Sequence, residues 1–192
     1  MGEKSVQKKR FILETARKVF MEKGFKRVTM KDIVEACDIS RGGLYLYFEN
    51  TGQIFLEVMR MESQEADDVF SIKEDATAAD ILVLFLEEQK KELLRKNDTL
   101  TKAVYEFYFE NTLGKRDNFL KRQFDSGGKM IEKLIEAGVE SGELYCEDCR
   151  AMAGNIMFLL EGLKISAQTI GISEETVDRE ILFILKSLGV EG

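Results

Sequence analysis

Residues 29–48 read TMKDIVEACDISRGGLYLYF, and the interpretation of this stretch decides the fold. Its end, from Leu44 to Phe48, alternates like a strand and follows two glycines, each of which weakens a helix by about 1 kcal/mol relative to alanine. No second strand pattern lies within reach, and a lone strand is not stable. At 100° per residue, Leu44 and Phe48 fall on one face, one turn apart. We therefore predict a short helix that buries both side chains.

The residues before this helix predict another short helix and a tight turn. Thr29 and Asp32 have the spacing of a capping box, with Asp in place of Glu. Asp38, at the turn, tolerates the left-handed conformation, and Ser40 is a natural N-cap. The apolar positions between them form one stripe: Met30, Ile33, Val34 and Cys37. Two short helices joined by such a turn form a helix-turn-helix motif, whose second helix enters the major groove of DNA.

The rest of the chain also predicts helices, since proline is absent and apolar residues recur at helical spacing. A polar break is expected at 73–75, and an interruption or bend at Gly127 and Gly128. We predict an all-α protein of about nine helices, with domains at 1–50 and 51–192. The further helices are expected near residues 6–23, 51–70, 77–96, 99–111, 115–141, 148–170 and 173–188.

Composition points to a soluble protein with a basic head. Residues 1–50 hold 11 lysines and arginines against 7 acidic residues, whereas residues 51–192 hold 17 against 28. This asymmetry favours contact of the head alone with a polyanion. No signal-peptide pattern is present, and the longest apolar run, 81–86, is far too short to cross a bilayer. Three cysteines, an odd number, favour reduced thiols, so we expect a cytoplasmic protein without a membrane partner.

The opening stretch resembles the DNA-binding signature of the tetracycline-repressor (TetR) family, and the resemblance extends over roughly residues 8–55. The positions that carry it are Thr29, Ile33, Ala36, Ile39-Ser40, Gly42, Leu44-Tyr45 and Phe48. The resemblance implies an N-terminal three-helix helix-turn-helix DNA-binding domain, followed by a helical ligand-binding and dimerisation domain. It implies a transcriptional regulator, most simply a repressor released from its operator by an unknown small molecule.

The resemblance also implies which residues meet double-stranded DNA. Arg41 is the best candidate for a guanine contact, because a guanidinium can pair with O6 and N7 together. Leu46 could pack in the core or contact a thymine methyl group. Gly43 replaces a usual Thr or Ser, and Thr51 replaces a usual Lys, for which basic residues 8–10 could compensate. The full set of expected contacts is Thr29, Lys31, Arg41, Gly42, Gly43, Tyr45, Leu46, Tyr47 and Thr51.

The expected helix 148–170 is apolar over most of its circumference and must be covered on two sides. We expect one side to face the chain's own core and the other a twofold partner. The expected interface residues are Ala153, Gly154, Phe158, Gly162, Ile181 and Leu185. Such a dimer would meet a palindrome-like operator, with half-site centres about 34–36 Å, or a multiple, apart.

Aromatic and methionine side chains of the body could line an apolar cavity for the effector, or form plain core. Glu106 or Glu110 could then partner a cationic ligand. The expected lining residues are Phe55, Met59, Phe85, Tyr105, Tyr108, Phe109, Phe124 and Met157.

No motif predicts catalysis, a metal or a cofactor. Histidine is absent, which removes the commonest general base, and so is a glycine-rich phosphate loop. Cys146 and Cys149 form a C-x-x-C, but zinc needs about four ligands and only Cys37 remains. Two alternatives stay open. A small helical enzyme using carboxylates predicts turnover without salt-sensitive DNA binding, and a scaffold with a vestigial head predicts that Arg41→Ala and Tyr45→Ala change nothing.

Overall fold

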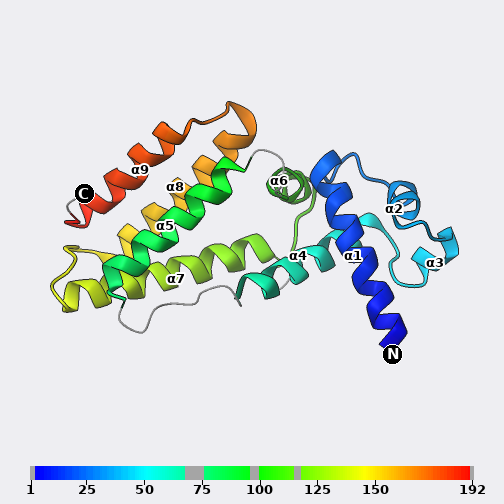
Figure 1. Cartoon of the computed structure of the whole chain (residues 1–192), viewed down its shortest axis with the longest axis horizontal. Helices are drawn as coiled ribbons and strands as arrows, with labels where there is room; N and C mark the ends of the chain where they lie inside the picture. The colour runs from blue at the N-terminus through cyan, green and yellow to red at the C-terminus, as the bar shows by residue number, and fades with distance from the viewer. Residues whose placement is uncertain (1–2, 68–75, 96–99, 115–117, 191–192) are drawn as a thin grey trace. The chain divides into compact units, whose positions relative to one another are not determined.

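The computed structural model describes residues 3–67, 76–95, 100–114 and 118–190, and all regular secondary structure within these ranges is helical (Figure 1). The all-α prediction is therefore confirmed. None of the described helices is long and apolar enough to cross a membrane. The helices are α1 (Glu3–Lys23), α2 (Met30–Cys37), α3 (Arg41–Tyr45), α4 (Thr51–Asp67), α5 (Ala78–Leu94), α6 (Thr101–Glu110), α7 (Phe119–Glu140), α8 (Cys149–Thr169) and α9 (Glu174–Ser187).

The strand-like stretch is a short helix followed by a turn. α3 ends at Tyr45, and the chain turns before Phe48. The Phe48 N–H still donates to the Leu44 carbonyl at 3.1 Å, which keeps the two residues one turn apart. Both side chains are buried, so the prediction that they share one inward face is confirmed.

The helix ends follow the signals in the sequence. The Thr29–Asp32 capping box is complete, because the Thr29 N–H donates to Asp32 at 2.8 Å and the Asp32 N–H donates to Thr29 Oγ1 at 3.2 Å. Gly24 ends α1 with a φ of 77°. Asp38 has a φ of 50° and is the one described non-glycine residue with a positive φ. Asp38 therefore forms the turn in the left-handed conformation.

α7 continues through Gly127 and Gly128, so the expected interruption is absent from this helix. A Cβ built on Gly127 would lie 3.0 Å from Met157 Cε. The glycine thus leaves room for the Met157 side chain of α8, whose flexible end would have to shift if a larger residue stood there. The expected boundaries at 70, 96, 99 and 115, and the polar break at 73–75, lie outside the described residues.

The first compact unit contains α1 to α4 and α6, and comprises residues 3–67, 100–114 and 118–119 among those described. Its core holds a cluster of four rings, Phe20, Phe25, Phe55 and Phe107, whose contacting centroids lie 4.8 to 6.0 Å apart. Phe107 belongs to α6, so this helix buries its inner face against the head. α6 therefore packs in the same compact unit as the head, and the domain boundary at residue 50 stays a prediction.

The second compact unit comprises residues 76–95 and 120–190. α5 packs against both α8 and α9, and Figure 1 shows α8 and α9 running antiparallel. The Lys90 ammonium binds Asp178 at 2.5 Å and Glu174 at 3.1 Å, which fixes α5 to the start of α9. The fully buried side chains of this core include Leu82, Leu86, Ile131, Ile135 and Val177.

Candidate nucleic-acid interface

The start of α2 is held by charge as well as by its cap. The Lys23 ammonium lies 2.5 Å from Asp32 Oδ1, and the Thr29 hydroxyl donates to Asp32 Oδ2 at 2.5 Å. These hydrogen bonds, with that of Lys23 the stronger, hold the pKa of Asp32 well below its usual range. The carboxylate therefore stays charged at neutral pH and joins the end of α1 to the start of α2.

α3 has one buried face and one face open to solvent. Leu44 packs in the core, whereas Arg41, Tyr45 and Leu46 are exposed, and Leu46 is 83% exposed. The Arg41 guanidinium lies 5.7 Å from the centre of the Tyr45 ring, close enough for a cation–π interaction. Leu46 therefore does not pack in the core of this chain, which leaves it free to contact a thymine methyl group.

Gly42 and Gly43 differ in the space around their backbones. A Cβ on Gly42 would meet nothing within 4 Å, so this position presents bare backbone to the outside. A Cβ on Gly43 would lie 3.1 Å from Ser40 Oγ, the atom that accepts the Gly43 N–H at 3.1 Å and caps α3. A side chain at this position would therefore crowd the capping hydroxyl. Asp32 and Asp80 carry side chains at the same position of their own caps, so crowding alone does not explain the glycine.

Three other residues that we predict to contact DNA lie outside α3. Lys31 is exposed and lies 3.6 Å from Glu35. Tyr47 is half-buried, and its hydroxyl accepts a hydrogen bond from Ser5 Oγ at 3.4 Å. Thr51 is half-buried at the first position of α4. Their contacts with DNA stay a prediction.

The basic residues 8–10 differ in the contacts that their charged groups make. Lys9 pairs with Glu57 at 2.9 Å, and Arg10 pairs with Glu14 at 2.7 Å. Lys8 is exposed, and its Nζ would lie 4.0 Å from a Cβ on Gly43. Of the three, Lys8 is the residue whose charge lies beside the start of α3.

Comparison with known proteins agrees with this arrangement. Residues 12–58 match the family model described as bacterial regulatory proteins, tetR family, and residues 81–178, just over half of the chain, match its model of a tetracyclin repressor-like C-terminal domain. The chain belongs to the tetR family of bacterial regulatory proteins. It is thus a transcriptional regulator and not an enzyme, which excludes the carboxylate-enzyme alternative.

Two curated tetR-like relatives are informative. The uncharacterized HTH-type transcriptional regulator YfiR of Bacillus subtilis is 31% identical over 134 residues, which cover 69% of this chain and 65% of that protein. The matched part therefore spans just under two thirds of the length of YfiR. The HTH-type transcriptional regulator QacR of Staphylococcus aureus is 23% identical over 146 residues, covering 74% of this chain and 76% of QacR.

Solved structures share the tetR fold. A putative transcriptional regulator from Saccharomonospora viridis, in complex with choline, has a TM-score of 0.82 at 23% identity and covers 94% of this chain and 96% of its own. A TetR transcription regulator from Haloarcula marismortui has a TM-score of 0.77 at 15% identity, covering 96% and 97%. At these identities the likeness concerns the fold alone.

The predicted ligand residues fall into both compact units. Phe55 and Met59 are buried in the first core, beside half-buried Tyr108, and Tyr105 stacks on Phe109 at 6.4 Å, with Phe109 itself 82% exposed. Phe85, Phe124 and Met157 belong to the second core. Each unit therefore brings together only part of the set. Their role in binding an effector stays a prediction.

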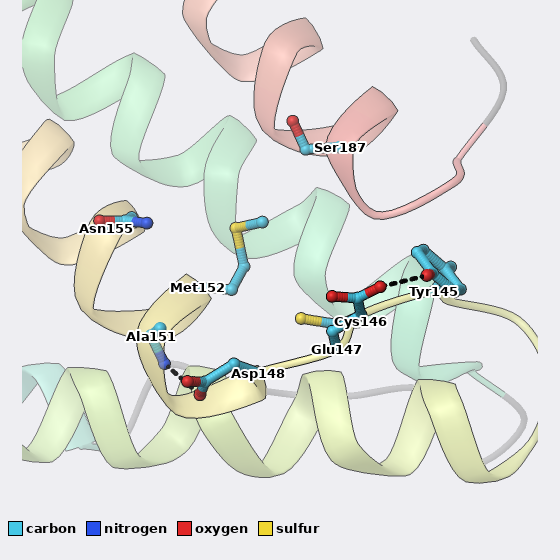
Figure 2. A pocket seen from close by; sticks show the side chains of 8 residues that line it. All are labelled: Tyr145, Cys146, Glu147, Asp148, Ala151, Met152, Asn155 and Ser187. Atoms are coloured by element: carbon cyan, nitrogen blue, oxygen red, sulfur yellow. Dashed lines mark hydrogen bonds between the residues drawn. The ribbon is translucent and has the colours of Figure 1, made fainter.

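A cavity of about 240 Å³ lies in the second unit, between the start of α8 and the end of α9 (Figure 2). None of the residues predicted to bind an effector lines it. Its walls are formed by Tyr145, Cys146, Glu147, Asp148, Ala151, Met152, Asn155 and Ser187.

The expected dimer residues divide by exposure. Ala153 and Ile181 are buried in the chain's own core, and Leu185 is half-buried. Phe158 is 69% exposed, and a Cβ on Gly154 or Gly162 would meet nothing within 4 Å.

Sequence reasoning missed Phe183 of α9, which is also 69% exposed, with Leu182 and Ile165 exposed as well. The signal was present in the run of four apolar residues 181–184, since a helix with one buried face leaves part of such a run outside.

Proposed function

We propose that this chain is a ligand-responsive transcriptional repressor that binds a palindrome-like operator through α3 and acts in the cytoplasm. The observation that carries the proposal is the outward face of α3. Arg41, Tyr45 and Leu46 are exposed there beside the bare backbone of Gly42. A guanidinium can recognise guanine through two hydrogen bonds, and a glycine lets the backbone approach a groove closely.

The exposed apolar side chains of α8 and α9 support a twofold dimer. Phe158 and Phe183 are each 69% exposed, and Ile165 and Leu182 add to the apolar surface. Gly162 offers a position at which a partner helix can approach without meeting a side chain. Apolar surface of this kind is characteristic of protein interfaces, and a twofold axis would present two copies of α3 to the two halves of one operator.

Contacts of α6 with the head support control by an effector. The Lys26 N–H donates to Glu106 Oε2 at 3.0 Å, and the Lys26 ammonium pairs with Glu110 at 2.8 Å. The Phe25 and Phe107 rings meet edge to face at 4.8 Å. A movement of α6 would therefore act directly on the turn between α1 and α2. Both carboxylates contact Lys26, and their role toward a cationic ligand stays a prediction.

An effector need only favour the conformation that does not fit the operator. It would then weaken operator binding, and the operator would weaken effector binding by the same factor. The choline complex of the structurally similar Saccharomonospora viridis protein supports a small organic effector. α6 is the element through which binding of the effector would change the position of the head.

Selection from a random pool of double-stranded DNA at physiological salt tests this proposal. We expect a palindrome-like sequence to be enriched. Arg41→Ala should then weaken binding to it by about 5- to 150-fold, the cost of losing one base contact. Arg150→Ala, an equivalent change at an exposed residue of the second unit, is the control and should bind like the wild type. Absence of any sequence preference would overturn the proposal, and unchanged binding by Arg41→Ala would favour a vestigial head.

A further inference from the structure

The segment between α7 and α8, residues 141–148, is fixed at two points. Leu144 is buried against Gly138 of α7, so closely that a Cβ on Gly138 would lie 2.5 Å from Leu144 Cδ1. The Tyr145 N–H donates to the Leu188 carbonyl at the end of α9 at 2.8 Å. The residues that follow Tyr145 are therefore held in place by two neighbouring helices.

Two cysteines flank the start of α8. Asp148 is its N-cap, with the carboxylate accepting the Ala151 N–H at 2.9 Å, and Cys149 is its first residue. Cys146 precedes the cap and lines the cavity between α8 and α9 (Figure 2). Both thiols are free and half-buried, and Cys146 lies close enough to Cys149 to raise the pKa of its thiol. Their side chains are therefore neighbours within a fixed segment.

The surroundings of the two thiols give them different chemistry. Burial and the neighbouring Cys146 raise the pKa of the Cys149 thiol, and the Glu136 carboxylate adds to this effect. A raised pKa disfavours the thiolate, which is the reactive form of cysteine, at Cys149. Cys146 lines the cavity, so it is the thiol that a small oxidant entering there would meet.

The same pair is a poor metal site. Among the residues that the structure describes, no group of three or more His, Cys, Asp or Glu side chains could hold a metal ion. A structural zinc ion takes four ligands. Two adjacent thiols without further ligands are instead the arrangement from which a disulfide forms.

We propose that Cys146 and Cys149 form a redox modification site, at which a hydroperoxide converts the two thiols into an intramolecular disulfide. The Cys146 thiolate attacks a peroxide oxygen. The O–O bond breaks, the leaving oxygen takes up a proton, and Cys146 becomes a sulfenic acid. The Cys149 sulfur then attacks the Cys146 sulfur and gives up its proton. The S–S bond forms, the S–O bond breaks, and the departing oxygen takes up that proton and leaves as water. Two electrons pass from the sulfurs to the peroxide.

Peptide mapping of the full chain tests this site directly. The protein is treated with a small excess of hydrogen peroxide, denatured, alkylated and digested for mass spectrometry. We expect the peptide that holds Cys146 and Cys149 to be lighter by two hydrogen atoms and to escape alkylation, with dithiothreitol reversing both effects. Cys37 is buried in the first core and should remain alkylated, as an internal control. Alkylation of both cysteines, or a sulfinic acid on Cys146 beside a free Cys149, would overturn the proposal.

Single variants test the two assigned roles. Cys149→Ser should accumulate a Cys146 sulfenic acid that dimedone traps, whereas Cys146→Ser should leave Cys149 reduced. Cys37→Ser is the matched control and should form the disulfide like the wild type. Loss of the Cys149 thiol at the wild-type rate in Cys146→Ser would show that the roles are wrong. None of these measurements needs DNA, so the site stands or fails apart from the proposed repressor function.

Discussion

The exposed face of α3 in the first compact unit is largely polar, whereas the exposed faces of α8 and α9 in the second carry phenylalanines. In the first, the outward side of α3 bears Arg41 and Tyr45 around a bare glycine. In the second, Phe158 and Phe183 are each 69% exposed. Leaving apolar surface in water forgoes about 25 cal/mol for every Å² that could be covered. The difference teaches that the exposed face of α8 and α9 is suited to meet another apolar surface, and that of α3 to meet a charged one.

The largest effect should come from the aromatic core of the first unit. Phe55 is fully buried among three other rings, so Phe55→Ala should lower the free energy of unfolding by about 3–5 kcal/mol. Phe109 of the same unit is 82% exposed, and Phe109→Ala should change it by less than about 0.5 kcal/mol. Urea denaturation followed by circular dichroism measures both. Equal costs would contradict the assignment of Phe55 to the core.

A smaller effect is expected on the exposed face of the second unit. Phe158→Glu should weaken self-association by about 2 kcal/mol or more, which is about 30-fold in the dissociation constant, because a charge would enter an apolar interface. Sedimentation equilibrium gives this constant. Phe109→Glu, at an exposed phenylalanine of the first unit, is the control and should self-associate like the wild type. A Phe158→Glu protein that dimerises normally would exclude this part of α8 from the interface.

The two glycines of α3 should respond differently to alanine. Gly42→Ala meets nothing and should raise the free energy of unfolding by about 0.5–1 kcal/mol, because alanine favours the helix. Gly43→Ala should gain less, since its Cβ would crowd the Ser40 hydroxyl, and an N-cap contributes about 1 kcal/mol. Urea titration of both variants measures the difference. Equal gains would show that the cap accommodates the methyl group.

The smallest effect concerns two capping boxes, one in each unit. Asp32 and Asp80 both have a lowered pKa, so each contributes stability that is present above about pH 4 and is lost as the pH falls through the folded-state pKa. Asp32 also binds Lys23. Asp32→Asn should therefore flatten the acid side of the stability profile more than Asp80→Asn does.

Unfolding at a series of acidic pH values compares the two variants. Combining each variant with Lys23→Ala is the control. Without the Lys23 ammonium, Asp32→Asn and Asp80→Asn should change the pH dependence of unfolding by more similar amounts. If Asp80→Asn flattened the profile as much as Asp32→Asn, the ion pair with Lys23 would add nothing to the cap.

Local features of the fold were predictable from the sequence. The capping box of Thr29 and the shared face of Leu44 and Phe48 depend on residues three or four positions apart. The packing of Phe107 against Phe55 joins residues far apart in the chain, and no local pattern specifies it. For the same reason the expected ligand residues, chosen by type, fell into two separate cores. The exposure of Phe183 depends on which face of α9 packs against the core.

The contacts of α6 with the head limit where two regulators of this family can be joined to exchange their operator specificity. A chimera joined at residue 50 would give Phe107 a foreign partner in place of Phe25, and would lose the ion pair of Glu110 with Lys26. Such a hybrid would inherit an operator preference without the contacts through which α6 could act on it. Transplanting the inner face of α6 together with the head keeps these contacts matched.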